Sequence, residues 1–189
     1  MAGHCRWLET RLFEVLGAWV AAEPDPEVKA MLAAHSLRHA WHAEVWHARL
    51  PRVAHLDADA LTVPAGEGVA GVVGALERAA GADQTVERLV GMARLVLPRL
   101  VAAYRARLQA AHPLADGPTV RWLGLVLADE AAALAELDRL LQARLDGDGR
   151  ALVERAAAFQ VELESLLAGP PTPAERLTGL PRPAQHESM

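Results

Sequence analysis

The 189-residue sequence is poor in several residue types, and each shortage excludes a class of protein. Cysteine occurs once, as Cys5, which excludes an internal disulfide and a cysteine-rich zinc site. Lysine also occurs once, as Lys29, and the formal net charge is −5. Because nucleic-acid binding needs a basic face, we expect no nucleic-acid partner.

Long hydrophobic runs are missing as well. Apolar runs such as residues 123–128 fall far short of the ~20 apolar residues that cross a bilayer. The first residues, MAGHCRWLETR, lack the basic-then-apolar order of a signal peptide. We therefore expect no membrane partner and a cytoplasmic location.

The sequence shows no strand-like alternation of useful length, no internal repeat, no glycine-rich phosphate loop and no Ser/His/Asp arrangement. What is present is helical periodicity, in which apolar residues recur every three or four positions. This pattern predicts an all-α fold. The expected helices cover residues 6–22, 26–50, 69–80, 83–111, 119–145 and 150–167.

The connections indicate how these helices pack. The first two are joined by the sequence EPDP, in which Asp25 is the expected helix cap and Pro26 the first helical residue. A link this short makes the two helices antiparallel. The next connection, of about 30 residues, is long enough to cross the length of a four-helix bundle. We expect Asp83 to cap the third long helix and Pro98 to bend it.

The chain divides into one domain and a tail. The helical bundle, with a fifth C-terminal helix capped by Asp148, is expected to span residues 1–168. Residues 169–189 contain five prolines and few apolar side chains. This composition predicts a flexible tail.

Three histidines occupy the face of helix 26–50 that should point to the core. At about 100° per residue, His35, His39 and His42 fall within about 60° of one direction, together with Leu32 and Trp46. A buried imidazole needs a hydrogen-bond partner or a metal ion. The histidines therefore predict a polar cluster inside the bundle.

Carboxylates on two other helices are expected to meet these histidines. Glu130 lies near the centre of the apolar stripe of the fourth long helix, and Glu9 lies at the edge of the stripe of the first. Depth in the bundle can be measured along each helix from its hairpin turn, at ~1.5 Å per residue. By this measure Glu9 and Glu130 lie at the same depth as His39 and His42, and Tyr104 lies about one helical turn away. A carboxylate buried at that depth costs several kcal/mol unless it is paired or coordinated.

These residues resemble the metal site of the ferritin-like superfamily of carboxylate-bridged metal bundles. Glu9 matches the family's first-helix glutamate, His42 its second-helix histidine, and Glu130 its fourth-helix glutamate. His39 stands where the family has a second glutamate, and Ala133 where it has a second histidine.

The resemblance covers roughly residues 6–146 and implies a ferritin-like four-helix bundle with a long crossover between its second and third helices. A dinuclear centre draws on about six side chains, and the third helix offers no carboxylate at this depth, so a single ion is expected. Two histidines and two carboxylates suit Fe, and also Mn or Zn. The implied metal ligands are Glu9, His39, His42 and Glu130, with His35 beside them and Tyr104 as a catalytic hydrogen-bond donor.

The sequence leaves three functions open. The first is a metal-dependent oxidoreductase or oxygenase that acts on a small molecule. The second is a metal-free ferritin-like remnant, in which Glu9 and Glu130 accept hydrogen bonds from imidazoles and the fifth helix and proline-rich tail bind a protein partner. The third is a DinB-like metal-binding bundle, ranked last because the fourth helix lacks the expected histidine. The sequence leaves the formation of a homodimer open.

Overall fold

The computed structural model describes residues 1–168 except positions 53, 56, 58, 113 and 148. The all-α prediction is confirmed, because the described residues form helices and no strand. None of the helices in this part of the chain is long and apolar enough to cross a membrane. The tail predicted over residues 169–189 lies outside the described residues. The elements are α1 (Ala2–Ala22), α2 (Pro26–His47), η1 (Asp59–Leu61), α3 (Glu67–Arg78), α4 (Thr85–Val90), η2 (Gly91–Val96), α5 (Leu97–Ala110), α6 (Gly117–Gly147) and α7 (Arg150–Leu166).

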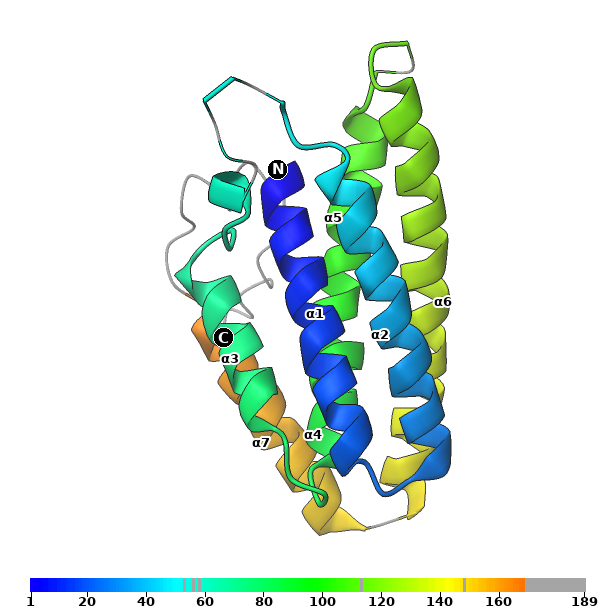
Figure 1. Cartoon of the computed structure of the whole chain (residues 1–189). Helices are drawn as coiled ribbons and strands as arrows, with labels where there is room; N and C mark the ends of the chain where they lie inside the picture. The colour runs from blue at the N-terminus through cyan, green and yellow to red at the C-terminus, as the bar shows by residue number, and fades with distance from the viewer. Residues whose placement is uncertain (53, 56, 58, 113, 148, 169–189) are drawn as a thin grey trace, which may run out of the picture.

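Helices α1 and α2 form an antiparallel hairpin (Figure 1). The Asp25 carboxylate accepts hydrogen bonds from the backbone N–H groups of Glu27 at 2.7 Å and Val28 at 3.0 Å, and Pro26 is the first residue of α2. The cap starts α2 directly after the turn. Positions on α1 and α2 at equal distance from Asp25 therefore lie at equal depth.

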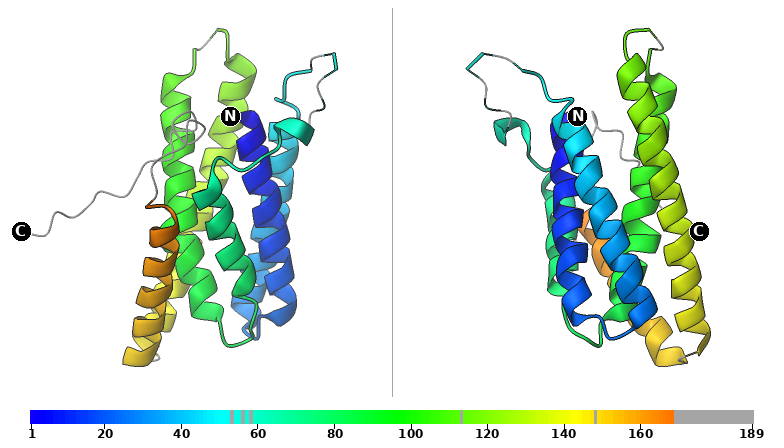
Figure 2. Two further views of the ribbon diagram at one scale, coloured as in Figure 1. Left: turned by 90° about the vertical axis from the view of Figure 1, so that its left-hand side faces the viewer. Right: turned by 45° about the vertical axis from the view of Figure 1, so that its right-hand side comes forward.

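The long connection carries the chain back along the bundle. It runs from the end of α2 through η1 and α3 to the start of α4, so that α2 and the continuous α4–η2–α5 segment point in the same direction (Figures 1 and 2). Helix α3 packs on α1 and on α7. This is the crossover arrangement expected from the length of the connection.

The expected Asp83 cap of the third long helix is wrong. The helix begins at Thr85, and Gln84 occupies the cap position without a side-chain cap bond to the helix. Residues 81–84 instead form a turn, in which the Gly81 N–H donates to Gln84 Oε1 at 2.8 Å and the Gln84 N–H donates to the Gly81 carbonyl at 3.1 Å. Because this turn includes Asp83, the helix cannot start there.

The helix changes its winding just before Pro98. Residues of η2 have the wider π-helical turn, and the Leu97 N–H donates to the Met92 carbonyl. A proline has no N–H and its ring collides with the carbonyl four residues earlier. The wider turn accommodates Pro98, so the helix continues into α5.

Helix α6 packs against α4, η2 and α5, and α7 covers α3 and α4 on the outside of the bundle (Figure 2). The predicted fifth helix is present as α7. Its expected cap, Asp148, lies outside the described residues, and Gly149 precedes α7 with φ of 79°. This left-handed conformation favours glycine.

Most of the core is aliphatic, and buried charged side chains gather in two places. Near the α1–α2 turn, Arg88 and Glu23 form a fully buried ion pair at 2.8 Å. Further along the bundle lies a second group, which consists of Glu9, His39, His42 and Glu130. The Arg88–Glu23 ion pair connects the end of α1 to α4. The Glu9, His39, His42 and Glu130 group has the composition of a metal site.

Candidate metal centre

Helices α1 and α2 bring Glu9 and His39 together. Glu9 is 0% exposed and His39 is 2% exposed. The His39 ring nitrogen Nδ1 lies 2.6 Å from Glu9 Oε2. Both residues lie about 15 positions from Asp25 along their helices, so the hairpin turn sets this contact.

Helix α6 contributes Glu130 to the same point. Its Oε1 lies 3.0 Å from His42 Nδ1 and 3.4 Å from His39 Nδ1. His42 Nδ1 is also 3.5 Å from Glu9 Oε2. Each imidazole therefore faces one carboxylate from α1 and one from α6, which lie on either side of α2 (Figure 1).

The four side chains converge on one point, and a modest movement of their side chains would bring them to the spacing of ligands around a single ion. One ligand atom from each of Glu9, His39, His42 and Glu130 lies within 4.8 Å of the others. Ligands of a tetrahedral ion with bonds of about 2.1 Å are ~3.4 Å apart. The second carboxylate oxygen of Glu130, Oε2, is buried and has no hydrogen-bond partner among the described residues. Such an oxygen is free to become a ligand.

The second ring nitrogen of His42 contacts Asp129. His42 Nε2 lies 3.3 Å from Asp129 Oδ2, and the Asp129 side chain is 42% exposed. Histidines that bind metal through one nitrogen usually donate the other N–H to a carboxylate, which orients the ring. Asp129 is not among the residues predicted from the sequence, although the need of His42 for a second partner on a neighbouring helix was a usable signal.

His35 makes a separate contact. Its Nε2 lies 2.9 Å from Glu136 Oε2, and its Nδ1 is buried without a partner among the described residues. Burial lowers the pKa of His35 despite the nearby Glu136 carboxylate. His35 shares a crevice between α2 and α6 with His39 and His42, but its hydrogen bond goes to Glu136, a residue not predicted from the sequence.

Tyr104 on α5 reaches the group from a fourth helix. Its hydroxyl donates to Glu9 Oε1 and accepts from Trp46 Nε1 at 3.1 Å. The Trp46 ring stacks on it with a centroid separation of 5.5 Å. Burial, and then the Glu9 charge, raise the pKa of Tyr104 well above 10, so the phenol stays protonated and orients the Glu9 carboxylate.

Electrostatics keep the histidines protonated in the absence of metal. Burial by itself raises the pKa of Glu9, but hydrogen bonds from His39 and His42 outweigh it and lower this pKa to about 2. Burial lowers the pKa of His42, but hydrogen bonds to Glu130 and Glu9 raise it to about 10. The pKa of His39 is also raised, because the Glu130 charge and the Glu9 hydrogen bond outweigh burial. A metal ion would have to displace these protons.

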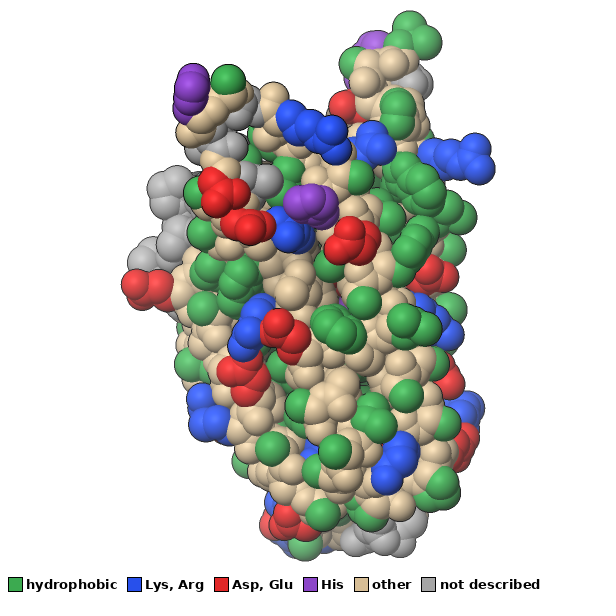
Figure 3. Space-filling view, in the orientation of Figure 1, with side chains coloured by type: hydrophobic (Ala, Val, Ile, Leu, Met, Phe, Trp, Pro, Cys, Tyr) green, Lys and Arg blue, Asp and Glu red, His purple; other side chains and the backbone are tan. Residues whose placement is uncertain are grey.

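Aromatic side chains cover the approach from the surface. The Trp41 ring lies 5.3 Å from the His42 ring and 5.7 Å from the Trp122 ring, measured between centroids. Hydrophobic side chains gather over the adjoining stretches of α2 and α6 (Figure 3). Asp129 is half-exposed and contacts His42, so it connects this buried histidine to solvent.

Comparisons with protein-family models, with curated proteins and with solved structures find no match to this chain. Its function must therefore be argued from the geometry of the site.

Proposed function

We propose that this protein binds one transition-metal ion, Fe or else Mn or Zn, through Glu9, His39, His42 and Glu130. The observation that carries the proposal is the convergence of these four side chains, from three helices, within 4.8 Å. Two carboxylates also balance the charge of a divalent ion when the imidazoles are neutral. Mixed nitrogen and oxygen ligands of this kind suit these metals.

The arrangement of the helices supports a ferritin-like origin for the site. An antiparallel hairpin, a long crossover and a second hairpin follow one another along the chain. Glu9, His42 and Glu130 occupy helix positions that match the family pattern. Ala133 replaces a ligand of that pattern, and α5 places apolar Leu100 at this depth. The remaining side chains are enough for one ion rather than two.

With a metal bound, we propose oxidoreductase or oxygenase activity on a small molecule. The ion would supply redox or Lewis-acid chemistry at an open coordination position. The chain's own residues then have defined tasks. Asp129 holds the His42 ring through Nε2, and Tyr104 holds the second oxygen of Glu9. The buried walls exclude water from the site.

A metal-free function is the second candidate, and a specific observation favours it. The hydrogen bonds of His39 to Glu9 at 2.6 Å and of His42 to Glu130 at 3.0 Å already pair the buried charges without an ion. In that case the cluster stabilises the fold, and the helical surface binds a protein partner. The two candidates differ in whether a metal binds at all.

Metal analysis of protein purified without a metal-affinity tag tests the proposal. We expect close to one Fe, Mn or Zn ion per chain, lost in His42→Ala and in Glu130→Ala. Exposed neighbours on α2 offer matched controls, and His47→Ala and Glu44→Ala should keep the metal. Metal-free protein whose melting temperature does not change on incubation with Fe(II), Mn(II) or Zn(II) would favour the metal-free candidate.

A further inference from the structure

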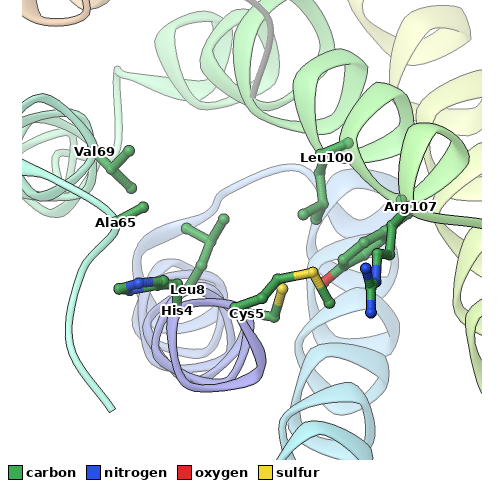
Figure 4. Close-up of a pocket in the computed structure, with 10 residues that line it drawn as sticks. His4, Cys5, Leu8, Ala65, Val69, Leu100 and Arg107 are labelled. Atoms are coloured by element: carbon green, nitrogen blue, oxygen red, sulfur yellow. The ribbon is translucent and has the colours of Figure 1, made fainter. Parts of the chain in front are cut away.

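Tyr104 lines a pocket that His39 and His42 do not line. It opens between the N-terminal part of α1, the segment leading into α3, and α5 (Figure 4). The space not filled by atoms is about 460 Å³, a volume that includes open solvent in front of the pocket. Leu8, Val69 and Leu100 point toward it, and Ala103 also lines it. These walls favour a hydrocarbon group.

One charged side chain stands at the end of the pocket near Tyr104. Arg107 is partly buried, and its Nε is buried without a hydrogen-bond partner among the described residues. None of the ion pairs found in the described part of the chain involves Arg107, whereas Arg88 pairs with Glu23 and Arg94 pairs with Asp138. Within the described part of the chain, the Arg107 guanidinium therefore has no carboxylate as a counter-charge.

The groups beside Arg107 do not supply that counter-charge. Burial raises the pKa of the Cys5 thiol to about 12, so this thiol is neutral at physiological pH. The Tyr104 hydroxyl donates its hydrogen to Glu9 Oε1, so Tyr104 presents no anionic oxygen to the pocket. At the other end of the pocket, His4 uses Nδ1 in a 2.9 Å hydrogen bond with the Val63 carbonyl and carries no negative charge. The pocket thus combines apolar walls with an unbalanced positive charge.

We infer that this pocket binds a small carboxylic acid with a short apolar chain. The hydrocarbon part contacts Leu8, Val69 and Leu100, and the carboxylate pairs with the Arg107 guanidinium. Arginine presents a planar set of N–H groups that matches a carboxylate in a two-bond contact. A neutral or cationic ligand of the same length would leave this charge unpaired and bind more weakly.

The position of the pocket also gives it a role in the proposed function. Tyr104 lines the pocket and donates its hydroxyl hydrogen to Glu9. A ligand bound there lies one side chain away from the metal ligands. The assignment of this acid as the substrate rests on the proposed metal-dependent activity, whereas the binding site itself does not.

Isothermal titration of metal-free full-length protein with hexanoate, hexanol and hexylamine tests the inference. EDTA treatment ensures that hexanoate cannot bind through the metal. We expect hexanoate to bind at least 10-fold more tightly than the other two. Arg107→Gln should remove this preference, whereas Arg105→Gln, an exposed arginine on the same helix, should retain it. Ala103→Phe, which fills the pocket, should abolish binding with the helical circular dichroism unchanged.

Equal affinities for the three ligands would overturn the inference, as would hexanoate binding that Arg107→Gln leaves unchanged. If Ala103→Phe does not fold, the Arg107→Gln comparison decides. Because the titration contains no metal, its result is separate from the metal analysis above. If the protein binds hexanoate but takes up no metal, the ligand-binding inference stands and the proposed metal-dependent activity is wrong.

Discussion

His39 Nδ1 lies 2.6 Å from Glu9 Oε2, and neither side chain reaches solvent, with 2% and 0% exposure. The two residues are 30 positions apart in the sequence and face each other across the α1–α2 hairpin. A buried carboxylate is costly unless an opposite charge or a hydrogen-bond donor compensates it. The pair therefore links the stability of the hairpin to the chemistry of the candidate metal centre.

Glu9→Ala should strongly destabilise the metal-free protein. Removing one partner of a buried ion pair typically costs about 3–5 kcal/mol, because the other charge stays buried without compensation. Urea unfolding followed by circular dichroism measures the change. Glu14→Ala is a suitable control on α1, since the Glu14 side chain is 46% exposed and its ion pair with Arg11 lies at the surface. A surface pair of this kind is worth about 0–1 kcal/mol. Equal effects of the two substitutions would contradict the buried pairing.

The stability of the metal-free protein should depend on pH in a defined direction. The pKa of Glu9 falls from 4.5 to about 2 on folding, so its contribution is complete above pH 4.5 and is lost as the pH falls toward 2. The pKa of His42 rises from 6.5 to about 10, so its contribution is complete below pH 6.5 and is lost as the pH rises toward 10. Maximum stability should therefore lie between these two limits, near pH 5 to 6.

Melting temperatures at pH 5.5 and pH 9 in the presence of EDTA test this pH dependence. The wild type should melt at a lower temperature at pH 9. The difference should shrink in His42→Gln, which removes the titrating group, and persist in His47→Gln, because His47 is exposed. A wild-type melting temperature that is the same at both pH values would argue against protonated histidines in the cluster.

Metal binding should release protons. The hydrogen bonds of His39 to Glu9 and of His42 to Glu130 each require a proton on Nδ1, which a metal ion must displace. We expect up to two protons per ion and an affinity that increases from pH 6 to pH 8. Calorimetric titration with Zn²⁺ in two buffers of different ionisation enthalpy measures the number released. Tight binding without proton release would place the metal elsewhere.

Asp129→Asn should weaken metal binding by about 10- to 100-fold, the usual effect of losing the carboxylate that orients a metal-bound histidine. Glu136→Gln is a matched control. Both acids lie on α6, are about equally exposed at 42% and 41%, and contact a buried histidine of α2. Asp129 contacts His42, which is a proposed metal ligand. Glu136 contacts His35, which lies outside the proposed ligand set. Competition with a chromogenic chelator measures both affinities, and equal losses would show that His35 supports the site as directly as His42.

Helical periodicity was enough to identify the four residues of the cluster. The side chains of a helix repeat every 3.6 residues, so the apolar stripe of α2 indicated which of its histidines face inward. Because the Asp25 cap and the short turn set the depth of α1 against α2, Glu9 could be placed opposite His39. The same argument placed Glu130, and the structure buries it at 1% exposure beside His42.

The flanking contacts could not be predicted in this way. Asp129 is rotated about 100° from Glu130 around α6, a position that faces solvent unless another helix lies on that side. The approach of α2 on that flank gives Asp129 its contact with His42. The start of the third long helix could not be predicted from the capping preference of Asp83 either. It depends on the turn at residues 81–84, which is closed by a hydrogen bond between Gly81 and Gln84.

The sequence by itself determined the helices, their inward faces and the depth of Glu9, His39, His42 and Glu130, because these follow from periodicity and from short turns, which are local properties of the chain. Only the tertiary structure decided the lateral contacts that surround this cluster. The contacts of Asp129 with His42 and of Tyr104 with Glu9, and the unpaired Arg107 in its apolar pocket, all depend on how separate helices approach. That approach results from packing side chains of the whole core, which no single segment encodes.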